Sequence, residues 1–288
     1  MKDMKGVVIA MVIFCVCWMP LYAEGQCIKG DCTDGRGTRV FADGTRYSGS
    51  FEHGLMNGEG EITFSDGRIY TGQFEHDALH GHGVITYPDG RKYIGEFRDN
   101  VISGRGTMMF PEGMVYSGQW EHDGMNGTGT MTFHDGSEYT GEWRDDRING
   151  EGVMEYADGR TYEGHWENDT VSGRGTMTYP DGSLYEGEWR NGEYNGTGKL
   201  TLADGGTYRG EFKNGMMDGS GMRTFPDGRR YDGDFVQGLF DGHGTLMYKD
   251  GTTYKGEWKK GKSHGMGVLT YPDGRTLEGQ FRDGNYCK

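Results

Sequence analysis

One period of this chain decides its fold: residues 139–161 read YTGEWRDDRINGEGVMEYADGRT. In its first part, Tyr139, Gly141 and Trp143 alternate with polar residues, which is the period-2 pattern of a strand with one apolar face. The alternation resumes over 150–156 after a short polar turn. Two such strands in succession predict a β-hairpin.

The pattern returns every 23 residues along most of the chain. Each period has Tyr, Gly two residues later, Phe or Trp four residues later, then Gly-x-Gly, an aromatic residue and Asp-Gly. Ten complete periods fill 47–276, with a half-repeat or cap at 24–46 and a C-terminal half-repeat at 277–288. The first column comprises Tyr47, Tyr70, Tyr93, Tyr116, Tyr139, Tyr162, Tyr185, Tyr208, Tyr231 and Tyr254, and Leu277 closes it.

Two kinds of turn join the expected strands. The first has Gly, Asp or Asn at one fixed position, as at Gly54, Asp77 and Asn100, and these residues tolerate a positive φ. The second is Asp-Gly, as at 66–67, which is typical of hairpins. The sequence therefore predicts a left-handed turn position in each hairpin.

The strand glycines are expected to make room for rings, because glycine otherwise weakens a strand. A large ring on one strand can lie flat over a glycine on its neighbour. An aliphatic column that runs from Ile62 to Leu269 would share this face, and Arg223 interrupts it.

The spacing Y-x-G-x-[FW]-x(6)-G-x-G with a later Asp-Gly resembles the MORN repeat family. The resemblance covers about residues 33–284 and is clearest over 139–152 and 185–198. It implies an all-β fold: an elongated, twisted antiparallel β-meander of tandem 23-residue hairpins with an aromatic-lined groove. It also implies a non-catalytic module for protein contact or membrane-associated scaffolding.

Composition and charge narrow the class of partner. The chain has 55 glycines, only 33% hydrophobic residues and a formal net charge of −14. Nucleic acid and anionic lipid both require clustered Lys and Arg, so neither is an expected partner. A cationic or neutral protein fits this charge better.

The N-terminal residues 1–23 have the layout of a secretory signal peptide. Lys2 and Lys5 precede an apolar run over 6–19, Pro20 ends the run, and Ala23 offers a cleavage site. An uncleaved anchor and a lipoprotein site are the alternatives. We expect an exported protein that is periplasmic, at the cell surface or extracellular.

Export implies an oxidising compartment, in which Cys27 and Cys32 could close a small local ring. Cys287 would then be unpaired or linked to another chain. A bond between Cys287 and an N-terminal cysteine is the rival pairing. It is disfavoured because a long array would hold its two ends far apart.

No catalytic, cofactor or metal site is expected. Every candidate Ser, His or Asp stands in a column of interchangeable residues, so no nucleophile, base and orienting group are set apart from the repeat. His76, His80 and His82 are interpreted as solvated turn residues. The Asp-Gly turns lack the carboxylate density of a calcium loop.

One aromatic strip is the candidate partner-binding surface. Its members are Trp120, Trp143, Trp166, Trp189 and Trp258. The alternative, that these rings pack in the core, is the favoured interpretation. An edge at 277–281 could also add a strand from another chain. The sequence thus predicts a non-catalytic extracytoplasmic scaffold for a protein partner or for itself, such as a homodimer. The alternative is a membrane- or envelope-associated module.

Overall fold

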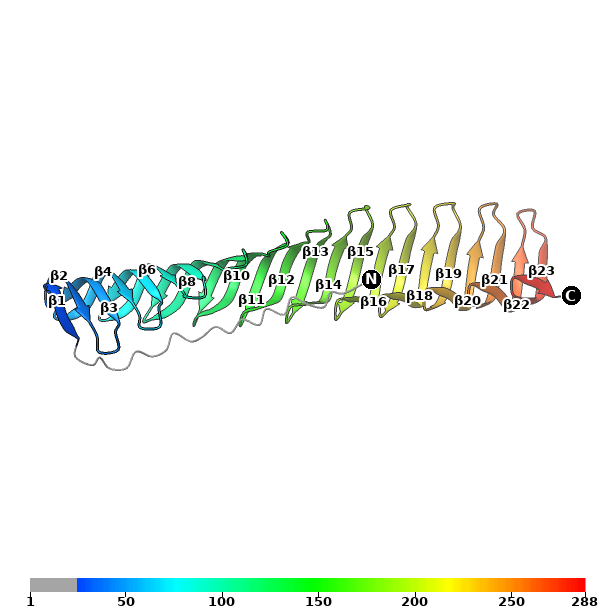
Figure 1. The fold of residues 1–288 in the computed structure, drawn as a ribbon. Helices are drawn as coiled ribbons and strands as arrows, with labels where there is room; N and C mark the ends of the chain where they lie inside the picture. Colours follow the sequence, from blue (N-terminus) through cyan, green and yellow to red (C-terminus); the bar gives the residue numbers. More distant parts are fainter. Residues whose placement is uncertain (1–24, 288) are drawn as a thin grey trace. The chain divides into compact units, whose positions relative to one another are not determined.

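The computed structural model describes residues 25–287, so the predicted signal peptide lies outside the described part. Over this range the chain forms 24 β-strands and no helix, which confirms the all-β prediction. The fold divides between Ala157 and Asp158 into two compact units. Within each unit, consecutive strands are antiparallel neighbours, so each is a meander of hairpins (Figure 1).

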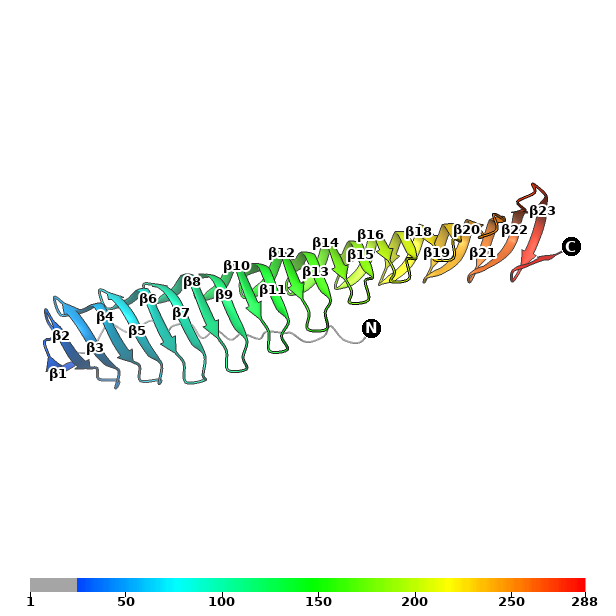
Figure 2. The ribbon, with the colours of Figure 1, turned by 90° about the horizontal axis from the view of Figure 1, so that it is seen from above.

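The unit before Asp158 contains the first twelve strands. They are β1 (Gln26–Gly30), β2 (Arg36–Val40), β3 (Arg46–Glu52), β4 (Leu55–Thr63), β5 (Ile69–Glu75), β6 (Ala78–Thr86), β7 (Lys92–Arg98), β8 (Val101–Met109), β9 (Val115–Glu121), β10 (Gly124–Thr132), β11 (Glu138–Arg144) and β12 (Arg147–Glu155). In Figure 2 they run side by side in chain order, with the connecting turns along the two borders of the sheet.

The unit after Ala157 repeats this plan with the other twelve. They are β13 (Thr161–Glu167), β14 (Thr170–Thr178), β15 (Leu184–Arg190), β16 (Glu193–Thr201), β17 (Thr207–Lys213), β18 (Met216–Thr224), β19 (Arg230–Val236), β20 (Leu239–Met247), β21 (Thr253–Lys259), β22 (Lys262–Thr270), β23 (Thr276–Arg282) and β24 (Asn285–Cys287).

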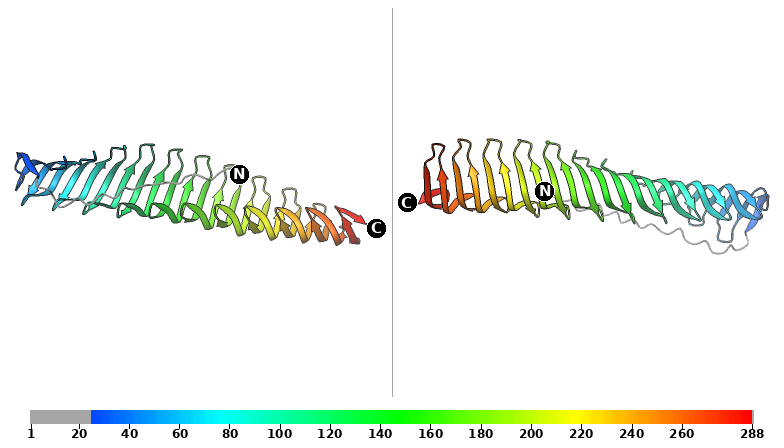
Figure 3. Two further views of the ribbon diagram at one scale, coloured as in Figure 1. Left: turned by 60° about the horizontal axis from the view of Figure 1, so that its bottom comes forward. Right: turned by 180° about the vertical axis from the view of Figure 1, so that it is seen from behind.

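Each hairpin bends across its middle. In the β5–β6 pair, Gly72 lies opposite Gly83, but the register then shifts before Phe74 pairs with Leu79. Gly81, in the skipped stretch, has a φ of 63°, a conformation that glycine adopts without steric cost. Such a bulge bends a strand, and the strands curve in both views of Figure 3.

The bend closes the apolar face of the sheet on itself. The rings of Tyr47 and Tyr70 are fully buried, and Phe74 is 3% exposed. Tyr47 makes edge-to-face contacts with Phe51 of its own strand and with Phe74 of the next repeat, at centroid distances of 5.1 and 4.8 Å. A single sheet therefore builds a core without a second layer, because each ring is enclosed by rings of its own and the following repeat.

The rings also explain two glycines in each period. A Cβ added to Gly83 would overlap the ring of Tyr70, and one added to Gly72 would overlap the Tyr70 hydroxyl and the backbone of the neighbouring strand. The tyrosine thus covers a glycine on its own strand as well as the expected one on the neighbouring strand. Arg223, which breaks the aliphatic column, places its guanidinium 4.5 Å from the centroid of the Phe225 ring.

The predicted left-handed turn position is confirmed. Asp77 has a φ of 68° and Gly54 a φ of 78°. The preceding residue is also left-handed, as in His76 with a φ of 48°, so the tip of the hairpin has two successive residues with positive φ. This is the type I′ geometry that matches the twist of two-residue hairpins.

Candidate functional site

The five tryptophans proposed as partner contacts lie in the core. Trp120, Trp143, Trp166, Trp189 and Trp258 are 2–6% exposed. The Nε1 of Trp143 donates to the Gly129 carbonyl oxygen at 3.2 Å, and Trp258 donates likewise to Gly244 at 3.1 Å. Burial and these hydrogen bonds agree with the core interpretation. A contact between these rings and a partner stays a prediction, and their burial argues against it.

The opposite face carries a polar column whose role the sequence did not reveal. Glu96 accepts a hydrogen bond on Oε1 from the backbone N–H of Arg105 at 3.0 Å, and Gln119 accepts one from Thr128 at 2.7 Å. The side chain lies over the left-handed glycine of its hairpin, so a Cβ on Gly104 would overlap Glu96. Most hairpins thus have a tyrosine over glycines on one face and a carboxylate or amide over another glycine on the other, while Ser50 and His165 take the latter position over Gly58 and Gly173.

Asp and Asn at the first turn connect successive hairpins. Asp123 Oδ1 accepts from the Ile102 backbone N–H at 2.8 Å, and Asp146 accepts from Met125 at 2.8 Å. Burial raises the pKa of both carboxyls, while these hydrogen bonds lower it in part. In later hairpins Gly occupies this position and contributes only its N–H, as Gly238 does to the Met217 carbonyl oxygen at 2.8 Å.

Of the histidines interpreted as turn residues, His76 lies in the β5–β6 turn, but His80 and His82 lie within strand β6, which corrects that interpretation for them. The His80 ring lies between Glu75 and Asp99, with N–O distances of 3.3 and 3.7 Å. Among residues 25–287, no three His, Cys, Asp or Glu side chains gather in a way that could hold a metal ion. The same range contains no helix long and apolar enough to cross a membrane.

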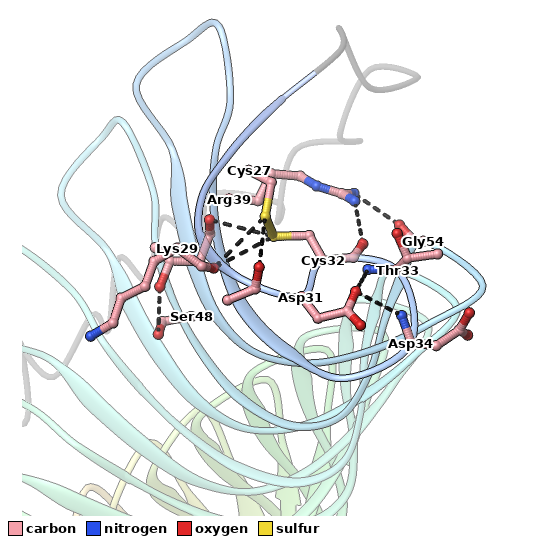
Figure 4. Close-up of a disulfide and its surroundings, with 11 residues drawn as sticks. Cys27, Lys29, Asp31, Cys32, Thr33, Asp34, Arg39, Ser48 and Gly54 are labelled. Atoms are coloured by element: carbon pink, nitrogen blue, oxygen red, sulfur yellow. Dashed lines mark hydrogen bonds between the residues drawn. A yellow bond between two sulfur atoms is a disulfide. The ribbon is translucent and has the colours of Figure 1, made fainter.

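A disulfide joins Cys27 to Cys32 at the start of the sheet, with Cα atoms 6.0 Å apart (Figure 4). This is the local ring expected from the sequence. Arg39 lies beside it and donates to the carbonyl oxygens of Cys32 and Gly54, at 2.8 and 2.9 Å. Its guanidinium also lies 4.7 Å from the centroid of the Phe51 ring. The disulfide thus links strand β1 to the β1–β2 turn, and Arg39 on β2 links that turn to the β3–β4 turn.

The predicted free edge at 277–281 is partly covered, which corrects that expectation. Strand β24 pairs with it, so that Phe281 lies opposite Tyr286 and Gln280 opposite Cys287. Tyr286 donates from its hydroxyl to the Glu278 carbonyl oxygen at 3.2 Å. A Cβ on Gly279 would contact this ring, so Tyr286 supplies the covering ring that Leu277 cannot. Cys287 is a free cysteine.

The exposed face of the second unit is hollowed over its glycine columns. The hollow has a volume of about 610 Å³, and three glycines are among the residues that line it. Its lining is His243, Gly244, Thr245, Lys255, Gly256, Met266, Gly267, Val268 and Glu278. Met266 is 55% exposed there, so the hollow combines apolar and charged contacts on an otherwise polar face.

Comparison with known proteins identifies the family. A family model described as MORN repeat matches residues 33–46, 47–67, 70–90, 93–115, 116–138, 139–159, 162–184, 185–207, 208–229, 231–253 and 254–274. These stretches cover most of the chain, which therefore belongs to the MORN repeat family. Such an array is a non-catalytic repeat scaffold for protein or membrane interaction.

Other comparisons add little. No curated protein matches the chain. Among solved structures, it is similar to the TCP10 domain of Danio rerio CPAP in complex with a peptide of Danio rerio STIL, at 15% identity and a TM-score of 0.33 over 89% of this chain and 100% of that chain. It is also similar to the TCP10c domain of Drosophila melanogaster Sas-4, at 14% identity and a TM-score of 0.31 over 66% and 100%. These TM-scores are too low to support an argument.

Proposed function

We propose that this chain is a non-catalytic, extracytoplasmic scaffold that binds a protein partner or a second copy of itself. One observation carries the proposal: the buried face is constant from repeat to repeat, while the exposed face varies. The residue after the column tyrosine points outward and takes many chemical types. It is Ser48, Thr71, Ile94, Ser117, Thr140, Glu163, Glu186, Arg209, Asp232, Lys255 or Glu278. A constant frame with a variable surface is suited to recognition.

The exposed face is a better candidate for the partner than the tryptophan strip. The strip is enclosed by its neighbours, whereas Ile94 and Met266 are 40% and 55% exposed on the outer side. Apolar side chains that remain exposed on a polar face are typical of contact surfaces. The hollow around Met266 offers one such surface, large enough for a few side chains of a partner.

The extracytoplasmic part of the proposal rests on two features. The apolar run over 6–19 has the length and flanking residues of a secretory signal. The Cys27–Cys32 disulfide fits an oxidising compartment. We propose the periplasm, the cell surface or the medium as the site of action.

Photo-crosslinking in the host cell tests the proposal. A photoreactive amino acid replaces Ile94 or Met266 on the exposed face, and Trp143 in the core serves as the matched control. We expect protein adducts from the two exposed positions, in the exported fraction only, and none from position 143. Adducts from position 143 alone would assign binding to the aromatic strip, and a chain retained in the cytoplasm would contradict export.

A membrane- or envelope-associated role is the alternative. A local group of lysines beside exposed apolar residues in the second unit favours this role. The net charge of −14 opposes it, because anionic lipid repels an acidic chain. Recovery of the protein in a membrane pellet that high salt releases would support this alternative.

A further inference from the structure

The hairpin tips form a border along each unit. A tip comprises the last residue of one strand, two turn residues and the first residue of the next strand, as in 52–55. Each tip is bonded to the residue that follows the preceding tip, as Asp77 N–H is to the Met56 carbonyl oxygen at 3.0 Å. Each repeat adds two strands, so tips follow one another at about 10 Å. Whatever side chains occupy the tips therefore form a regularly spaced row.

One part of this row is basic and apolar. We call the tips 213–216, 236–239 and 259–262 the lysine border. Their charged residues are Lys213, Lys259, Lys260 and Lys262, with no Asp or Glu. Their apolar residues are Met216, Val236 and Leu239, which are 44%, 48% and 49% exposed. Elsewhere the strand-ending position of Val236 holds a charged residue in every hairpin from Glu52 to Arg282.

Two aspartates bind the backbone of the lysine border and keep their negative charge, so they offset only part of the charge of its four lysines. Asp218 accepts from the Gln237 N–H and Asp241 from the Lys260 N–H, each at 3.1 Å. The hydrogen bonds that link each tip to the preceding hairpin continue through this stretch, since Gly261 donates to the Phe240 carbonyl oxygen at 2.8 Å. The three tips thus present one continuous surface.

The first unit carries the complementary surface. We call the tips 52–55, 75–78, 98–101 and 121–124 the acidic border. Its exposed carboxylates are Glu52, Glu75, Asp99 and Glu121, and its only Lys or Arg is Arg98. Its turn histidines are His53, His76 and His122, and each has a carboxylate within 4.0 Å. Leu55 is 36% exposed and gives this border an apolar contact as well.

We propose that the lysine border of one copy docks on the acidic border of a second copy. The two borders have opposite charge, both have exposed apolar residues, and both repeat at the same spacing, so successive tips can match over several repeats. The contact joins two different surfaces, which makes it heterologous. It deepens the proposed function by naming a second copy as one partner of the scaffold.

A second copy fits better than an anionic membrane. The lysine border alone could approach an acidic surface, but the remainder of a chain with net charge −14 would be repelled by it. A second copy carries the same net charge, so this repulsion opposes both contacts. The acidic border differs from a membrane because its opposite charges stand in a row with the spacing of the tips.

Charge reversal on each border tests the proposal. The full chain is expressed in an exporting host and purified as the host leaves it. One variant combines Lys259→Glu, Lys260→Glu and Lys262→Glu, and a second combines Glu52→Lys, Glu75→Lys and Glu121→Lys. Lys29→Glu, Lys92→Glu and Lys249→Glu form the matched control, because these exposed lysines lie outside the tips and outside the hollow. Far-UV circular dichroism verifies that each variant keeps its β signal.

Sedimentation velocity at low and high salt gives the outcome. We expect the unaltered chain and the control to self-associate at low salt and to dissociate as salt screens the charges. Each border variant should raise the dissociation constant at least about tenfold. An equimolar mixture of the two border variants should restore association, because the reversed borders then complement each other.

Three results would overturn the proposal. The first is a chain that stays monomeric at low salt at every concentration reached. The second is association that neither border variant weakens, or that the mixture does not restore. The third is a monomer that binds phosphatidylserine vesicles and loses this binding in the lysine variant, which would assign the border to a membrane. None of these results alone contradicts a different protein partner, which the crosslinking experiment detects separately.

Discussion

Tyr70 on β5 covers Gly83 on β6 so closely that any side chain at that glycine would occupy the space of the tyrosine ring. The hydroxyl of Tyr70 donates to the Gln73 carbonyl oxygen at 2.8 Å, which fixes the ring in this position. The same pair of contacts recurs along both units, as with Tyr139 and Gly152. The relationship between ring and glycine is therefore the structural unit of the repeat.

Replacing Gly141 with Val should destabilise the fold more than replacing Thr140 with Val. A Cβ at 141 would lie 2.6 Å from Gly152 Cα and overlap the Tyr139 hydroxyl, whereas Thr140 is exposed on the other face. We expect Gly141→Val to lower the free energy of unfolding by about 2–4 kcal/mol, and Thr140→Val to change it by no more than about 0.5 kcal/mol. Urea unfolding of both variants measures this difference. Equal midpoints would contradict the covering role of the ring.

The stability of a hairpin should depend on the hydrogen-bond acceptor in its polar column and not on the negative charge of that side chain. Glu96→Gln keeps an oxygen that can accept from the Arg105 N–H, as Gln119 does in its own hairpin. Glu96→Ala leaves that N–H without the side-chain acceptor, so we expect it to cost about 1 kcal/mol, with Glu96→Gln close to neutral. Thermal unfolding of the two variants decides, and a larger loss for Glu96→Gln would indicate an electrostatic role instead.

The repeat predicted the strands, the turn positions and the covering of glycine by a ring, because each depends on residue type and spacing within one period. The sequence favours core packing for the aromatic face, but it does not show how the rings are enclosed. A period-2 pattern shows that Tyr47 and Phe51 share a face, but not that the sheet bends at Gly58 and lets those rings enclose one another. The role of Glu96 was hidden for a different reason, since a polar residue on an exposed strand face looks like ordinary surface. Tyr286 lies beyond the last full period, so no column identified its role.

Strongly alkaline solution should unfold the protein. Burial raises the pKa of Tyr47 and of Tyr208 to about 12, whereas an unfolded tyrosine has a pKa of about 10. Below pH 10 both states keep the phenol proton and the full stability is present. Between those values the unfolded chain loses protons that the folded chain retains, so stability falls as the pH rises. Tyrosinate absorbance and far-UV circular dichroism should therefore change together. Titration of all tyrosines near pH 10 with the β signal intact would contradict this.

Deletion of one whole period should leave a folded protein. Removing residues 70–92 joins Ile69 to Tyr93, so strand β4 meets a strand with the same columns that β5 had. Each repeat in an array is stabilised mainly by its neighbours, and the deletion replaces one set of neighbours with an equivalent set. Removing only 70–91 is the matched control, because it puts Lys92 where Tyr70 stood and moves the side chains of the strand that pairs with β4 to the other face. We expect the 23-residue deletion to keep its β signal and unfold cooperatively, and the 22-residue deletion to lose most of its stability. If both deletions were equally stable, the enclosed ladder of rings would not be what holds the hairpins together.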